Sequence, residues 1–237
     1  MSENPELISH MENPNANKEK NKLIRQKLNG CMKANGYKRG RCSSYYRITN
    51  DVVVYFKPEH PSVMTYLWLC FYPLYMHPGD IRVFSFGDRI SSLTDQYIWD
   101  LRDYESEDSI DIWCNRIAEI ISTRVSSFVQ QVATAHSIDR LFDGRDNCVD
   151  IDGFLHVGAE KANELAMFTK LVLHQYDEAV QIAQHTQSAG VDGRLRVTRC
   201  LSGHCKTVID LVTIRDAQYI DETIGTWREA NIARFLL

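Results

Sequence analysis

The chain lacks the features that would place it in or across a membrane. Its longest apolar run, Tyr66 to Tyr75, is about ten residues long, whereas a membrane-spanning helix needs roughly 18. Residues 1–20 lack the basic start and the apolar stretch of a signal peptide. A strong net charge is also lacking, because the value of -4 is too mild to indicate a partner. We therefore expect a cytoplasmic protein with no membrane partner.

Paired cysteines are missing as well. The seven cysteines are odd in number and scattered, and no CxxC pair occurs. In a chain without a secretion signal this pattern predicts free thiols. Three of them, Cys31, Cys70 and Cys114, lie within apolar patterns, and we expect them to be small core residues.

Metal-ligand spacing is poorly developed. A closed zinc site usually shows tightly paired ligands, and the soft ligands near the end of this chain are spaced more loosely. The sequence therefore predicts no metal and no cofactor. The residues that come nearest to a ligand set are Cys200, His204 and Cys205, with His174 or His185 as a fourth.

Catalytic motifs are absent too. The chain contains no P-loop, GxGxxG, GxSxG or HExxH, which favours a non-enzymatic protein. An enzyme with a cleft between the two halves of the chain remains an alternative, because ligand sites favour domain junctions. The candidate residues for that cleft are Asp150, Asp152 and His156.

The front half of the chain alternates between helical and extended patterns. Apolar residues recur at helical spacing from about Lys22, and Asn35-Gly36 supplies a left-handed stop. The polar pair Asn50-Asp51 between two β-branched runs predicts a hairpin. The expected elements are helices at about 22–34 and 109–135 and strands at about 43–49, 52–57, 63–72 and 81–86.

The back half predicts helices at about 159–173, 176–189, 200–214 and 219–237. The stretch LVLHQYDEAVQIAQ resembles the turn of a tetratricopeptide-type helical hairpin, with Tyr176 and Ala179 at its packing positions. We expect an α+β fold, in which a small, mainly antiparallel sheet flanked by helices is followed by an all-helical C-terminal bundle. The expected boundaries are a disordered tail at 1–20, an α+β domain at 21–138, a linker loop at 139–153 and a helical domain at 154–237.

The segment LIRQKLNGCMKANGYKRGRCSSYYRITNDVVVYF combines an apolar helix, a Gly-Tyr-Lys stop and a Tyr-Tyr-Arg strand that leads into a hairpin. With these features, residues 22–135 resemble a family of bacterial proteins known as domain of unknown function 4304. Such proteins look like neighbours of bacterial toxin–immunity and defence loci. The resemblance implies a bacterial immunity or defence-associated protein that binds a protein partner.

Acidic and aromatic residues gather in the second quarter of the chain. Six acids and one base lie between Asp100 and Asp111. Clustered carboxylates speed association with a cationic partner, and tyrosine or tryptophan anchors hold it. We expect this segment to bind a basic protein, with a solvated loop as the alternative interpretation. The expected contact residues are Tyr97, Trp99, Asp100, Asp103, Tyr104, Glu105 and Glu107.

Basic residues dominate the stretch before the hairpin. Ten basic residues and a single acid lie between Lys18 and Arg47, and cations alternate with tyrosines in YKRGRCSSYYR. This mixture suits phosphate contact and base stacking, so nucleic-acid binding is the second hypothesis. A solvated face whose charges are offset by the acidic segment is the other interpretation. The candidate nucleic-acid-binding residues are Lys38, Arg39, Arg41, Tyr45 and Arg47.

Overall fold

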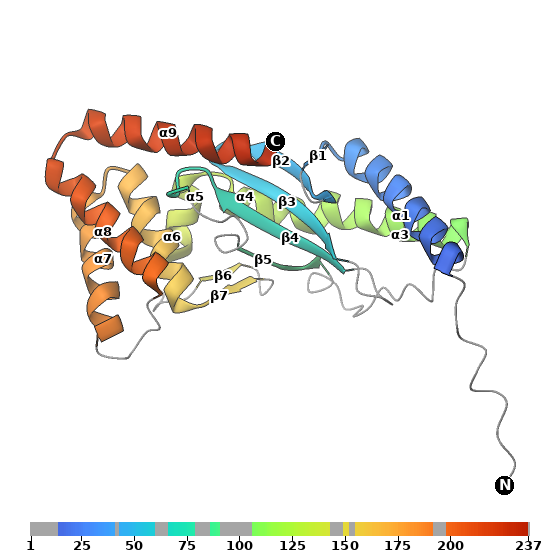
Figure 1. Ribbon diagram of the computed structural model, residues 1–237, viewed down its shortest axis with the longest axis horizontal. Helices are drawn as coiled ribbons and strands as arrows, with labels where there is room; N and C mark the ends of the chain where they lie inside the picture. The colour runs from blue at the N-terminus through green and yellow to red at the C-terminus, as the bar shows by residue number, and fades with distance from the viewer. Residues whose placement is uncertain are drawn as a thin grey trace, which may run out of the picture.

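A five-stranded antiparallel sheet lies at the centre of the computed structural model, and helices lie on both of its faces (Figure 1). A mostly helical region follows the sheet in the chain, so the predicted α+β fold with a helical C-terminal part is confirmed. The structure describes residues 14–40, 43–59, 66–78, 86–90, 106–142, 149–151, 155–191 and 198–236.

The strands lie in the sheet in chain order, and each pairs with the next in antiparallel fashion. They are β1 (Lys38–Arg39), β2 (Tyr45–Thr49), β3 (Val52–Glu59), β4 (Tyr66–Pro73) and β5 (Phe86–Arg89). β2 and β3 form the predicted hairpin, and Asn50 at its turn has a φ of 50°, which asparagine tolerates better than most residues. Residues 63–65 and 81–85, expected to be extended, lie outside the described residues.

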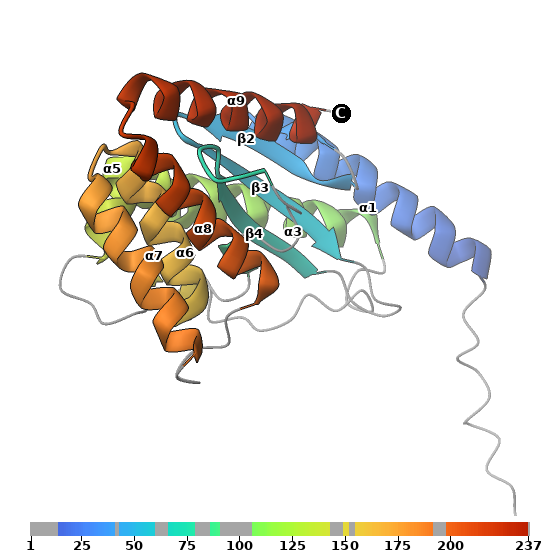
Figure 2. The same ribbon diagram turned by 60° about the vertical axis from the view of Figure 1, so that its left-hand side comes forward.

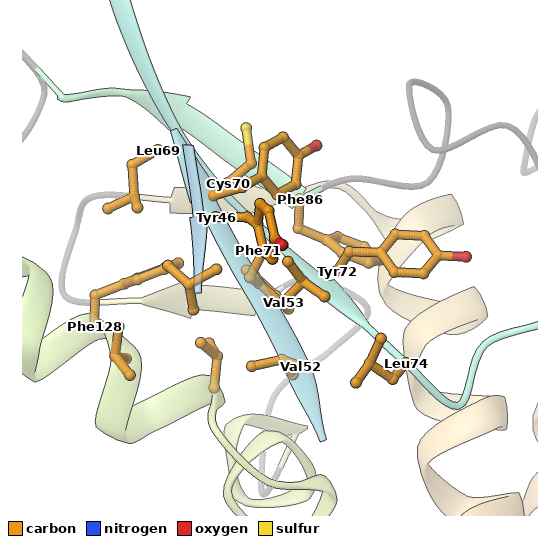
Figure 3. Close-up of a cluster of buried hydrophobic side chains, with 14 of the residues drawn as sticks. Tyr46, Val52, Val53, Leu69, Cys70, Phe71, Tyr72, Leu74, Phe86 and Phe128 are labelled. Atoms are coloured by element: carbon orange, nitrogen blue, oxygen red, sulfur yellow. The ribbon is translucent and has the colours of Figure 1, made fainter. Parts of the chain in front are cut away.

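The two faces of the sheet follow from the alternation of side chains along each strand. On the face that we call the α1–α3 face, Val52, Val54 and Phe56 are fully buried. Phe71 lies on the same face, stacks on Phe86 at 5.1 Å between ring centroids and meets the edge of Phe128 at 5.7 Å. Figure 3 shows Leu69 and Phe128 on one side of these strands and Tyr72 on the other.

Two helical segments cover the α1–α3 face. They are α1 (Pro14–Ala34) and the continuous run of α3 (Glu107–Ile120), η5 (Ile121–Val125) and α4 (Ser126–Val132). The helix predicted from about Lys22 begins at Pro14, and Gly36 ends it with a φ of 80° as expected. The helix predicted at 109–135 is interrupted by the π-helical turn η5. There, hydroxyl groups such as those of Ser122 and Thr123 bond to the Glu119 carbonyl, which loosens the backbone ladder.

The last helix, α9 (Ala217–Leu236), covers the other face of the sheet, which we call the α9 face (Figure 2). The ring of Phe235 lies 5.4–6.3 Å, centroid to centroid, from the rings of Tyr46, Tyr55 and Tyr72. The end of the chain therefore completes the core of a sheet built from its first half.

The helices of the back half pack at one end of the sheet (Figure 2). They are α6 (Ala159–Val172), α7 (Tyr176–Val191) and α8 (Arg199–Ile214), preceded by the short elements α5 (Ala135–Asp139), η6 (Arg140–Phe142), β6 (Val149–Ile151) and β7 (Leu155–Val157). The observed ends of α6 and α7 lie within two residues of the ends predicted for the helical hairpin. Ala179 is fully buried at its packing position.

Buried residues of the sheet and of the back half form one continuous hydrophobic cluster. The expected linker at 139–153 contains η6 and β6, and β6 pairs with β7. That residues 21–138 and 154–237 unfold as separate domains stays a prediction. Within the described ranges, no helix combines the length and the apolar character needed to cross a membrane.

Candidate functional site

Polar side chains from three elements converge where the helical region meets the sheet. Glu164 comes from α6, Cys200 and His204 come from α8, and His77 follows β4. Cys200 and His204 are four residues apart in one helix, which places both on the same face. Glu164 is 40 residues away in the chain from His204 and is brought to it by the packing of α6 against α8.

The three residues of α6 and α8 lie in a line. The Nδ1 atom of His204 is 2.5 Å from Oε1 of Glu164, and its Nε2 atom is 3.8 Å from Sγ of Cys200. Glu164 and His204 are each 5 % exposed, whereas Cys200 is exposed. The line therefore runs from a buried carboxylate through an imidazole to a thiol that reagents can reach.

The Glu164 carboxylate determines which nitrogen of the His204 ring carries the proton. An ionised carboxylate only accepts hydrogen bonds, so Nδ1 of His204 donates to Glu164. The neutral ring then carries its lone pair on Nε2, which faces the Cys200 thiol. If Nε2 takes up a proton, the nearby Glu164 carboxylate stabilises the resulting imidazolium, as a carboxylate partner generally does for a histidine base.

Aromatic rings surround the imidazole of His204. Phe168 meets it edge-on at 5.6 Å between centroids, and the ring of His77 lies 5.2 Å from it. Trp227 of α9 packs against both His77 and Phe168. Burial, followed by the charges of His204 and Arg234, lowers the pKa of His77. The Nδ1 atom of His77 is buried without a hydrogen-bond partner among the described residues.

The thiol itself stands at the beginning of α8. Although Cys200 is exposed, partial desolvation of its thiol, followed by the Glu164 charge, raises its pKa, so the resting thiol is protonated at neutral pH and needs a base to react. Cys200 is the second residue of the helix, whose N-cap Thr198 accepts a bond from Leu201. The first N–H groups of a helix have no acceptor inside it and carry partial positive charge. Arg199 and Cys200 are the first two residues of α8, so their N–H groups belong to this set.

The neighbouring cysteine plays a different part. Cys205 is fully buried, and burial raises its pKa to about 11. Cys200 and Cys205 are five residues apart in α8, so at about 100° per residue their side chains point roughly 140° apart around the helix. The described part of the chain holds no group of three histidine, cysteine, aspartate or glutamate side chains that could bind a metal.

The residues of the predicted basic surface divide between solvent and core. Lys38 and Arg39 are exposed on β1, and Arg41 lies outside the described residues. Arg47 lies over the ring of Tyr37 at 4.9 Å, and Tyr45 is only 5 % exposed. Of the tyrosines that alternate with these cations, Tyr37, Tyr45 and Tyr46 are all buried in the core. Phosphate contact by Lys38 and Arg39 stays a prediction, but none of these three rings is free to stack on a base.

Most of the predicted acidic surface lies outside the described residues. This holds for Tyr97, Trp99, Asp100, Asp103, Tyr104 and Glu105. Glu107 begins α3, and its Oε1 lies 2.7 Å from Nζ of Lys27 on α1, while Asp111 lies 2.9 Å from the same nitrogen. Side-chain hydrogen bonds to Glu107 and Asp111 raise the pKa of Lys27. Part of the charge segregation in the sequence is therefore neutralised within the molecule.

The residues expected at a cleft between the two halves are only partly described. The backbones of Asp150 and His156 are partners in the β6–β7 hairpin, and Asp152 lies outside the described residues. Sequence reasoning named Cys200 and His204 only as weak metal ligands and did not name Glu164. The spacing of four residues between Cys200 and His204 was the one local signal that placed them together.

No family model matches the chain, and comparison with curated proteins and with solved structures found no match either. The resemblance of residues 22–135 to the family of unknown function stays a prediction. Fold and site together define an α+β protein with a cysteine–histidine–glutamate line at its sheet–helix junction.

Proposed function

We propose that the protein is an enzyme that uses Cys200 as a nucleophile, with His204 as its general base and Glu164 as the group that orients and charges the imidazole. The line of contacts from Oε1 of Glu164 through His204 to Sγ of Cys200 carries the proposal. Covalent catalysis needs this order of parts: a nucleophile, a base within reach of it, and a third group that holds the base.

The arrangement suits transfer of an acyl group to water or to another acceptor. Sγ attacks the carbonyl carbon while its proton passes to Nε2 of His204, and the carbonyl oxygen takes the negative charge. The N–H groups of Arg199 and Cys200, in the first turn of α8, are the donors that we expect to stabilise that oxygen, since helix starts leave such groups free. Nε2 then returns the proton to the leaving group. Water, deprotonated by the same nitrogen, hydrolyses the thioester and restores the thiol.

The first test measures activation of the thiol without a known substrate. Iodoacetamide alkylation of Cys200, followed site by site with peptide mass mapping, should be at least about tenfold slower in His204→Gln than in the unaltered protein. Glu164→Gln should fall between the two. Cys205→Ser is the matched control, because Cys205 is buried one residue beyond His204, and it should leave the rate unchanged. Equal rates in folded His204→Gln and unaltered protein would refute the base role.

The second test asks for the covalent intermediate. 4-Nitrophenyl acetate should leave an acetyl group on Cys200, visible as a mass increase in the peptide that contains it. Cys200→Ala should abolish the adduct, and His204→Gln should slow its formation at least about tenfold. Acetylation of Cys200 at the rate seen in the urea-unfolded chain would argue against an enzyme site.

Binding of a basic protein through the acidic segment is the second candidate function. The observation that favours it is the capped start of α3, where Ser106 and Ser109 form a reciprocal capping box and Lys27 pairs with Glu107 and Asp111. The acidic segment leads into this helix start, so its C-terminal end is attached to a fixed point. A segment attached in this way loses less conformational entropy on binding than one that is free at both ends. The charge-removal variant described in the Discussion tests this candidate.

A further inference from the structure

Two cysteines meet on the α1–α3 face, far from the site at the junction. Cys31 of α1 and Cys114 of α3 are both free, Cys31 half-buried and Cys114 buried. The Sγ atom of Cys31 lies 3.3 Å from the backbone oxygen of Cys114, 83 residues away in the chain. The cysteines are scattered in the sequence, but the packing of α1 against α3 brings these two together.

An ion pair holds the two helices in register beside the cysteines. Lys27, one turn before Cys31, bonds to Asp111, which lies almost one turn before Cys114. The helices therefore run side by side in the same direction. Along both helices, the two cysteines lie about one turn after the ion pair. This register places the Cys31 sulfur beside the backbone of Cys114.

The two thiols differ in character. A side-chain hydrogen bond from Cys114 lowers the pKa of Cys31, and the same bond raises the pKa of Cys114. The amide of Asn35 also reaches the Cys31 sulfur at 4.0 Å. Cys31 is therefore the more readily ionised and the more accessible partner, which is the position of an attacking thiol in disulfide exchange.

We propose that Cys31 and Cys114 form an oxidisable dithiol whose oxidant is a small disulfide of the glutathione class. The Cys31 thiolate attacks one sulfur of the external disulfide, forms a mixed disulfide and releases one thiolate. Cys114 then loses its proton and attacks the Cys31 sulfur, which releases the second external thiol. Two protein thiols are oxidised to one disulfide, and one external disulfide is reduced to two thiols.

The new bond would join α1 to α3, which lie on the same face of the sheet but are separated in the chain by its five strands. It would close a loop that contains all five strands, and long loops lose the most conformational entropy in the unfolded chain when they are closed. Oxidation should therefore raise the thermal midpoint of the protein by several degrees and should leave Cys200 at the junction unpaired.

The test incubates the full chain with oxidised glutathione and then maps the disulfides by mass spectrometry. The unaltered protein should lose two hydrogen atoms in mass, yield a Cys31–Cys114 peptide pair and melt several degrees higher. Cys114→Ser should trap a glutathione adduct on Cys31, because the resolving thiol is gone. Cys31→Ser should leave the buried Cys114 unmodified. Cys70→Ser, which removes a buried thiol on β4, is the control and should behave like the unaltered protein.

Two results would overturn the proposal. One is a folded protein that keeps both thiols under oxidation that fully oxidises a vicinal model dithiol. The other is a peptide map in which Cys31 or Cys114 pairs with a different cysteine, or in which Cys114→Ser gives no adduct at Cys31.

Discussion

The two faces of the central sheet are closed in different ways. The α1–α3 face is packed with Val52, Val54, Phe56 and Phe71, and the helices against it supply further apolar side chains. The α9 face is rich in tyrosine, and polar atoms as well as rings join it to the helix above it. The stability of the α1–α3 face therefore depends on the packing of apolar side chains, whereas that of the α9 face also depends on hydrogen bonds.

Asn231 of α9 is the centre of the polar contacts. Its Nδ2 atom donates to the backbone oxygens of Leu74 and Met76, at 2.9 and 2.8 Å, and its Oδ1 atom accepts from the Tyr72 hydroxyl. Asn231 is fully buried, so water cannot replace a lost partner. The α9 face therefore accepts one particular helix in one particular register, whereas the α1–α3 face requires apolar side chains of suitable size.

The largest expected effect is on the α1–α3 face. Phe128→Ala removes a ring that is 2 % exposed and lies against Phe71, and a cavity of this kind costs about 3–5 kcal/mol. Urea denaturation should show a lower midpoint with an unchanged slope. Phe128→Leu is the matched control and should cost less than half as much. A loss under 1 kcal/mol in Phe128→Ala would mean that the face collapses around the cavity.

The second-largest loss of stability is expected on the α9 face alone. Asn231→Leu keeps the volume and leaves three buried polar groups without a partner, at a cost of about 3 kcal/mol. Hydrogen exchange should accelerate in α9 and remain slow in α3. The control Ile232→Leu changes the adjacent residue, which is partly buried, and should be nearly neutral. Uniform acceleration in both helices would show that the two faces open as one unit.

The junction beside the α9 face should also be sensitive to acid. Burial lowers the pKa of His77 in the folded protein below its ordinary value of 6.5. The unfolded chain therefore takes up this proton first as the pH falls through about 6.5, and stability decreases below that pH. Unfolding free energies measured at about pH 7.5 and pH 5.5 should differ less in His77→Phe than in the unaltered protein. An identical difference would show that other groups carry the acid sensitivity.

The smallest effect on stability concerns the acidic segment. Asp100, Asp103, Glu105 and Glu107 changed together to Asn or Gln should alter stability by no more than about 0.5 kcal/mol each. Association with a basic partner, recovered by pull-down from the host, should slow in low salt. A partner that binds at the unaltered rate would leave the segment as a solvated loop and remove the second candidate function.

The local elements were largely predictable because their signals are local. The hairpin at Asn50-Asp51, the stop at Gly36 and the helices on either side of His174 all follow from residue types within a few positions of one another. The π-helical turn η5 was not predictable, because the apolar stripe continues through it and only hydroxyl contacts interrupt the ladder.

The candidate site was beyond sequence reasoning for a different reason. Cys200 and His204 are neighbours on one helix, but Glu164 joins them only through the packing of α6 against α8. Tyr45 was misleading in the opposite way: its alternation with cations suggested an exposed ring, while the sheet register turns it into the core. The alternation along a strand predicts which side chains share a face of the sheet. The helices packed on each face then decide whether those side chains are exposed to solvent.

Local patterns predict the α+β class, the order of helices and strands and the apolar stripes, because these depend on periodicities of two and 3.6 residues and on turn chemistry. The return of α9 to the sheet, the contact of Cys31 with Cys114, and the line of thiol, imidazole and carboxylate depend instead on how the elements pack. The pairings of Glu164 with His204, of Cys31 with Cys114 and of Tyr55 with Phe235 join residues 40, 83 and 180 positions apart. Their energy comes from mutual burial, which local patterns do not record.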